Sequence, residues 1–195
     1  MPRKPRILVK GGYYHILTRG NDRRKLFRYK QDYRYFLEIV RKYLAKFQIS
    51  IIHYCLMPNH LHLLIQAHEA GDLPKFMQGV LQVYADYFRK KYGSVGFVFQ
   101  NRYKSFLIDS EAYLLECGRY IERNPLRAGL TDELLNYPWS SFSFYAVGKP
   151  NNVIKLMDPL YSNLVKTEKE CQQYYQNYVY KERPYDLIVD KAFRI

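Results

Sequence analysis

Two histidines one residue apart, His60 and His62, are the side chains of this sequence whose spacing most directly suggests chemistry. Met57-Pro58-Asn59 interrupts an apolar segment just before them, so we expect a strand to begin near His60. Residues two apart on a strand point to the same face, about 6–7 Å apart, so the two imidazoles should project together. Such a pair is half of a metal site, although two polar residues on an edge strand would give the same pattern.

A second candidate group lies on a helix predicted over about Glu111–Arg123, which Ser110 can cap and Pro125 should stop. Its apolar stripe contains Leu114, Cys117, Gly118 and Ile121, and roughly 100° around the helix lie Tyr113, Glu116, Tyr120 and Asn124. Tyr120 and Asn124 are four residues apart and therefore neighbours. The chain has 21 tyrosines, so spacing alone does not separate a functional phenol from an ordinary half-exposed one.

The elements that must position these groups follow from hydrophobic periodicity. Strands are predicted at Tyr13–Arg19, Ser50–Leu56, His60–Gln66, Phe97–Phe99 and Lys104–Ile108, and helices at about Lys30–Phe47 and from Asp72 to Gly93. The order strand, helix, strand, strand, helix, strand predicts an α+β fold with a ferredoxin-like antiparallel sheet. Two helices would cover one face of this sheet and leave the other face free for a site.

Charge and composition point to a nucleic-acid partner. The chain has 31 Lys and Arg against 18 Asp and Glu, and a net charge of +13 attracts polyanions, although a merely basic protein would share it. The many tyrosines suit stacking on unpaired bases. No apolar run approaches the roughly 18–20 residues of a membrane span. Three widely spaced cysteines, Cys55, Cys117 and Cys171, suggest reduced thiols and hence a cytoplasmic protein.

The motifs together resemble the single-tyrosine HUH (His-hydrophobic-His) transposases, which are IS200-like, and most of all their REP-associated branch. The resemblance rests on Met57–Leu64 followed about 60 residues later by Arg119–Leu130, and it is supported by His15–Asn21, Phe99–Ser105 and Tyr137–Ser141. It implies a transposase domain over residues 1–147, with a basic arm at 1–10. Residues 148–195 would be a partly helical C-terminal extension that packs on the domain, covers the active site or binds DNA.

The resemblance also implies roles for individual residues. His60 and His62 match metal ligands, Asn124 matches a third ligand, and Tyr120 matches the nucleophile, with Tyr113 as the alternative on the same helix face. Mg²⁺ or Mn²⁺ is the expected metal, although the ligand types alone would also accept zinc. Tyr120 would attack phosphorus, expel the 3′-oxygen and form a 5′-phosphotyrosine link. Glu116 and Gln66 are candidates for assisting loss of the phenolic proton.

The expected substrate is single-stranded DNA that forms a hairpin beside a short guide sequence. Basic residues at strand ends and in loops are the predicted DNA contacts, although each could be a solvated charge: Arg6, Lys10, Arg19, Arg23, Arg24, Arg102 and Lys104. We expect a monomer, in which Tyr120 completes its own site, rather than a homodimer. Two alternatives remain: a non-catalytic single-strand binding module, and a replication-initiator nickase, which the short chain and missing helicase disfavour.

Overall fold

A four-stranded antiparallel sheet with strand order β2-β3-β1-β4 organises the computed structural model, which describes residues 6–193. The strands are β1 (Gly12–Arg19), β2 (Ile49–Met57), β3 (His60–Ala67) and β4 (Lys104–Ile108). The inner strands β3 and β1 pair with each other, and every pairing is antiparallel. This strand order is that of the ferredoxin-like fold, so the predicted α+β class is confirmed.

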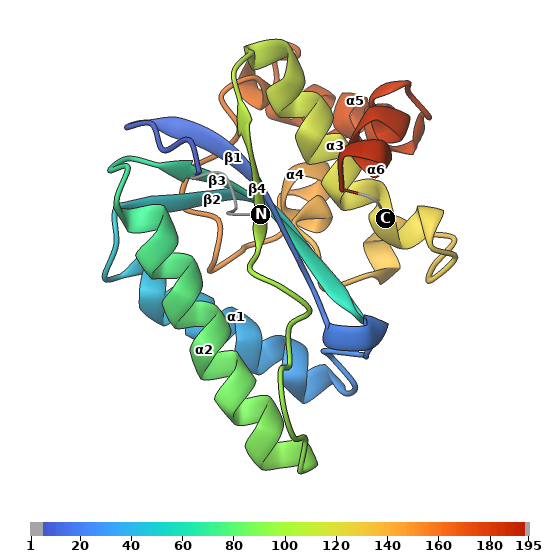
Figure 1. Ribbon diagram of the computed structural model, residues 1–195. Helices are drawn as coiled ribbons and strands as arrows, with labels where there is room; N and C mark the ends of the chain where they lie inside the picture. Colours follow the sequence, from blue (N-terminus) through green and yellow to red (C-terminus); the bar gives the residue numbers. More distant parts are fainter. Residues whose placement is uncertain (1–5, 194–195) are drawn as a thin grey trace.

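Helices cover both faces of the sheet (Figure 1). One face carries α1 (Lys30–Leu44) and α2 (Asp72–Tyr92), and the other carries α3 (Glu111–Arg127). Around α3 gather the shorter helices of the C-terminal part: α4 (Phe142–Val147), α5 (Glu168–Tyr180) and α6 (Tyr185–Phe193). The expectation that one face is left free is therefore wrong, because α3 and the extension occupy it.

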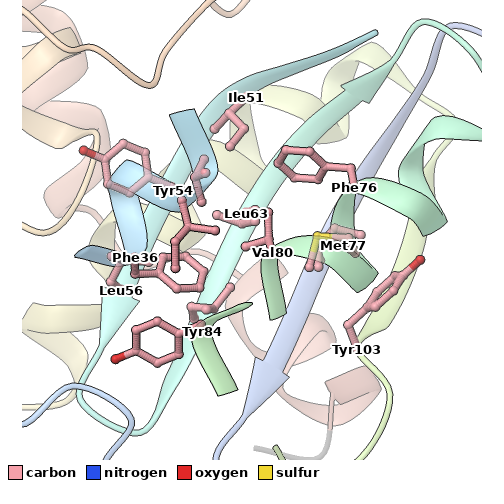
Figure 2. Close-up of a cluster of buried hydrophobic side chains, with 14 of the residues drawn as sticks. Phe36, Ile51, Tyr54, Leu56, Leu63, Phe76, Met77, Val80, Tyr84 and Tyr103 are labelled. Carbon is pink, nitrogen blue, oxygen red and sulfur yellow. The ribbon is translucent and has the colours of Figure 1, made fainter. Parts of the chain in front are cut away.

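Strand alternation divides the core between the two faces. Leu61, Leu63 and Ile65 of β3 point toward α1 and α2, into a buried cluster that includes Phe36, Phe76, Val80 and Tyr84 (Figure 2). Each such side chain contributes about 1.5–3 kcal/mol through burial. On the opposite face of β3, His62 and Leu64 point toward α3. The same alternation thus builds one core and presents the histidines to the other.

The outer edge of β2 is closed by the C-terminal part of the chain. Leu56 N donates to Trp139 O at 2.9 Å, Ser141 N donates to Tyr54 O at 3.0 Å, and Ile154 forms an isolated parallel bridge with Ile51. All nine residues of β2 are buried as a result. An edge strand whose backbone groups are paired in this way offers no template for another chain.

Three predicted boundaries differ from the structure. Phe97–Phe99 is not a strand, because only an isolated bridge joins Phe99 to Gly20. Helix α1 ends at Leu44 rather than Phe47, which packs on the core after the chain has turned. Helix α3 continues through Pro125 to Arg127. Proline lacks the N–H that would donate to Ile121 O, but Asn124 Nδ2 donates to that carbonyl at 3.3 Å and to Tyr120 O at 2.7 Å.

A buried polar cluster joins β2, α3 and the extension. His53 Nδ1 lies 2.8 Å from Glu122 Oε1, and His53 Nε2 lies 3.1 Å from Asp158 Oδ2. Tyr175 Oη of α5 donates to the second oxygen of Glu122 at 2.9 Å. Burial alone would lower the pKa of His53, but the two carboxylates raise it to about 9. The imidazolium is therefore the form that this cluster stabilises.

Two further expectations can be compared with the structure. Cys55, Cys117 and Cys171 are all buried and carry free thiols. Within residues 6–193, no helix combines the length and the apolar composition that crossing a membrane requires.

Candidate active site

The two histidines of the sequence motif lie at the start of β3 with their rings together. The ring centroids of His60 and His62 are 5.1 Å apart at an interplanar angle of 84°. His60 Nδ1 lies 2.7 Å from Asn59 Oδ1, so the neutral ring can donate its N–H there. His60 Nε2 is buried and has no hydrogen-bond partner among the described residues. A nitrogen held in this state is available as a metal ligand.

A third histidine, His15, lies beside this pair. The antiparallel register sets Leu17 of β1 opposite His62, and His15 shares the α3 face with both. His15 Nε2 is 3.0 Å from His62 Nδ1. Burial lowers the pKa of His15 to about 3 and that of His62 well below its ordinary value, so both rings are neutral at pH 7. The sequence predicts His15 on a strand but does not place it beside His62, because the pairing register cannot be read from a local pattern.

The phenol of Tyr120 lies against these imidazoles. Its ring centroid is 5.7 Å from that of His62 and 5.8 Å from that of His15, and its side chain is fully buried. Tyr120 Oη donates to Asp190 Oδ1 of α6 at 2.9 Å. Burial, and then the charge of Asp190, raise the pKa of Tyr120 well above its ordinary value. The strand and the distant helix therefore bring the predicted ligands and nucleophile to one place.

Two polar residues follow Tyr120 on the same face of α3, one and two turns further on. Asn124 commits its amide nitrogen to the helix carbonyls of Tyr120 and Ile121, so its side-chain oxygen is the atom that could hold a metal. The guanidinium carbon of Arg127 lies 5.3 Å from the centroid of the Tyr120 ring. Arg127 also donates hydrogen bonds to both carboxylate oxygens of Asp190, from Nη1 to Oδ1 at 3.1 Å and from Nη2 to Oδ2.

The other candidates, two on α3 and one on β3, make contacts with partners other than Tyr120. Tyr113 is half-exposed and stacks on Tyr185 of α6, with ring centroids 5.7 Å apart. Glu116 pairs with Arg119 and Arg183. Gln66, at the far end of β3, donates to Gly11 O. None of these contacts joins Glu116 or Gln66 to Tyr120.

Three of the predicted DNA-contacting residues line a hollow at the end of β1 that pairs with the start of β3. Arg19 lies opposite His60 in the β1–β3 register, and after burial its charge is the second cause that lowers the pKa of His60, to about 4. Arg19, Arg102 and Lys104 line a hollow of about 300 Å³. Arg6 lines the adjoining hollow of about 720 Å³, where its guanidinium lies 3.9 Å above the ring of Tyr103.

The remaining predicted DNA contacts are less closely grouped. Arg23 and Arg24 lie in the turn after β1, and Arg24 Nη1 donates to Ser94 Oγ at 2.6 Å. Lys10 pairs with Glu69 at 2.8 Å, at the end of the sheet where Gly12 pairs with Ala67. Gly12 and Arg19 are seven positions apart along β1, a distance of about 23 Å. Lys10 is thus not brought to the site, and Arg3 and Lys4 of the predicted arm lie outside the described residues.

The side chains near His60 provide part of the ligand set that a divalent ion needs. Among the residues that the structure describes, no three His, Cys, Asp or Glu side chains converge as a metal site. His60 and His62 fit two ligand positions, and a complete protein site would need a further donor such as the Asn124 oxygen. The orphaned and buried Nε2 of His60 is the structural sign that favours an ion at this point.

Known proteins are similar to this chain in sequence and in fold. Residues 8–124 match the family model described as "Transposase IS200 like". A Haemophilus influenzae protein named "Putative REP-associated tyrosine transposase" is 27% identical over 154 residues, which cover 70% of this chain and 83% of that protein. A solved structure of a REP-associated tyrosine transposase bound to a REP hairpin matches the fold with a TM-score of 0.64 at 19% identity, over 78% of this chain and 90% of that one. With its fold, its histidine pair and the match over more than half its length, this chain belongs to the IS200-like transposase family and is similar to the REP-associated tyrosine transposases.

Proposed function

We propose that this protein cleaves and rejoins single-stranded DNA through a covalent 5′-phosphotyrosine link to Tyr120. The observation that carries the proposal is the 5.7 Å separation between the rings of Tyr120 and His62, with His60 beside them. In the cleavage step the Tyr120 oxygen loses its proton and forms a bond to phosphorus, while the bond to the 3′-oxygen breaks and that oxygen takes up a proton to become a 3′-OH. A free 3′-OH can then reverse the step, because the phosphotyrosine keeps the phosphodiester bond energy.

His60, His62 and the side-chain oxygen of Asn124 would hold a divalent ion, which we propose to be Mg²⁺ or Mn²⁺. When bound, such an ion supplies Lewis-acid polarisation of the scissile phosphate. The chain's own contribution is to keep the imidazoles neutral and aimed. Burial lowers the pKa of His60 to about 4, so protons do not compete for its nitrogen at neutral pH.

The substrate is proposed to be a DNA hairpin with an adjoining single-stranded segment. The solved relative with a similar fold was bound to a REP hairpin. In this chain, Arg19 lies opposite His60 in the strand register, and the hollows lined by Arg19, Arg102, Lys104 and Arg6 are suited to a phosphate backbone. A single chain contains both the imidazoles and Tyr120, which supports a monomer whose tyrosine acts in its own site.

Covalent capture tests the proposal. A labelled single-stranded DNA hairpin is incubated with the protein and Mg²⁺ or Mn²⁺, and the covalent protein–DNA adduct is quantified on a denaturing gel. We expect an adduct with the wild type and with Tyr113→Phe, and none with Tyr120→Phe, which should still bind the hairpin. His60→Ala should also lose the metal-dependent adduct.

The outcomes separate the functions under consideration. An undiminished adduct with Tyr120→Phe would reject this nucleophile. Tight hairpin binding by a wild type that forms no adduct with any divalent ion would favour the non-catalytic binding module instead.

A further inference from the structure

We propose that Arg127 is a further catalytic residue, which binds a non-bridging oxygen of the scissile phosphate and neutralises charge as Tyr120 attacks. This inference rests on the proposed phosphotyrosine chemistry and adds to it a residue outside the histidine–tyrosine motif. Arg127 keeps its protons throughout, and the bonds that form and break remain those at phosphorus.

Geometry is the first support. Arg127 is seven residues after Tyr120, two turns along the same face of α3, and its guanidinium carbon lies 5.3 Å from the phenol ring centroid. Pro125 does not end the helix, so this face continues as far as Arg127. A cation fixed at this distance can reach an anion that touches the Tyr120 hydroxyl.

The second support is the anion that the structure holds at this point. Asp190 accepts a hydrogen bond from Tyr120 Oη at 2.9 Å and further hydrogen bonds from both terminal nitrogens of Arg127. Burial would raise the pKa of Asp190, but the hydrogen bonds from Arg127 and Tyr120 lower it, so the carboxylate is charged. Guanidinium forks bind carboxylate and phosphate oxygens with the same geometry. A phosphodiester that replaced Asp190 here would lie between the nucleophile and Arg127.

The third support is the contrast with the other arginines of α3. Arg119 is completely buried and bonded to Glu116, Asp186 and the carbonyl of Lys181, and Arg123 is similarly enclosed. The side chain of Arg127 is 25% exposed, and its hydrogen-bonded partner Asp190 is 27% exposed. Arg119 and Arg123 hold the extension in place, whereas Arg127 faces a position that solvent and DNA can reach.

Single-turnover adduct formation with the labelled hairpin tests this role. Arg127→Ala should slow the step by about 10²–10³-fold, as the loss of one transition-state donor typically does. Arg127→Lys should lose less, because it keeps the charge and loses the fork. Hairpin affinity, measured separately, should change by less than about tenfold, since one phosphate contact among several is removed.

Glu182→Gln is the control for a purely structural role. Glu182 of the extension pairs with Arg123 of α3, and its side chain is 86% exposed. This variant removes an ion pair between α3 and the extension but leaves Tyr120, Arg127 and Asp190 intact, so it should keep the wild-type rate. A second readout replaces the scissile phosphate by an uncharged methylphosphonate. The ratio of wild-type to Arg127→Ala rates should then shrink by about tenfold or more, because the charge that Arg127 neutralises is gone.

Three results would overturn the role of Arg127: a wild-type rate in Arg127→Ala, an equal loss in Glu182→Gln, or an unchanged rate ratio with methylphosphonate. All are read against a wild type that forms the adduct. A wild type without an adduct would instead refute the proposed function, so the two failures are distinct.

Discussion

The imidazole of His15 sets the state of His62 without belonging to the histidine motif. With Nε2 of His15 3.0 Å from Nδ1 of His62 and both rings neutral, one ring must donate its N–H to the other. Such contacts orient a metal-ligating imidazole and select its tautomer. His15 is therefore a positioning residue for the proposed ion.

His15→Ala should weaken Mn²⁺ binding by about 10–100-fold, the usual effect of removing a partner behind a metal-ligating histidine. Calorimetric titration of the DNA-free protein with Mn²⁺ measures the affinity directly. His68→Ala is the control, because His68 bonds to Ser50 at the other end of the sheet. Equal affinities for the wild type and His15→Ala would refute the positioning role.

The site residues that could be predicted from the sequence stand in local patterns, whereas most of those that were missed depend on contacts between distant parts of the chain. His60, His62, Tyr120 and Asn124 stand in short local patterns, and a period of two or four residues suffices to group them. His15 needed the β1–β3 register, and Asp190 needed the packing of α6, which no local pattern specifies. Arg127 was missed for a local reason: Pro125 was expected to end the helix, which removed Arg127 from the face of Tyr120.

Helix α3 can approach β2 closely because position 118 has no side chain. A Cβ added to Gly118 would lie 2.5 Å from Nε2 of His53, a buried ring that is held between Glu122 and Asp158. The sequence predicts Gly118 in the apolar stripe of this helix, but only the packed structure shows that the missing side chain makes room for the ring of His53. The same approach brings Tyr120 toward the imidazoles of β3.

Gly118→Ala should lower the free energy of unfolding by about 1–3 kcal/mol, because overpacking a rigid buried contact displaces the helix or the ring. Thermal or urea unfolding measures the change. Gly71→Ala is the matched control: Gly71 has φ −74° and no atom within 4 Å of an added Cβ, so its unfolding free energy should stay within about 0.5 kcal/mol of the wild type. A Gly118→Ala protein as stable as Gly71→Ala would show that α3 does not depend on this approach.

At the scale of the whole molecule, the ferredoxin-like order and most strand bounds were predictable because alternation and turn residues are local. The helical content of the C-terminal part was predictable too, but its packing was not, since its helices bury their faces against α3 and against one another and its loop closes the edge of β2. Thr167 and Glu170 form a capping box that marks the start of α5. The surfaces that the C-terminal helices cover are set by contacts between residues far apart in the chain, which local patterns do not specify.

The cluster that joins the extension to the sheet should make stability depend on pH. His53 faces Glu122 from α3 and Asp158 from the extension, and the rings of Tyr145 and Tyr175 stack on it. Its pKa is raised from 6.5 to about 9 in the folded protein. A pKa raised by folding means that the stabilisation is fully present below about pH 6.5 and is lost as pH rises to about 9.

The free energy of unfolding should therefore fall between about pH 7.5 and 9, by roughly 2 kcal/mol. Urea unfolding across this range measures the slope, and His53→Gln should flatten it because an amide does not titrate. Burial lowers the pKa values of His15, His60 and His62 in the folded protein, so these rings bind protons only in the unfolded chain and add a slope of opposite sign near pH 6.5. Above about pH 7.5 the unfolded chain has lost those protons too, and the slope is left to His53. The same slope in His53→Gln as in the wild type would place the proton elsewhere, and would mean that the extension is held by packing rather than by this buried imidazolium.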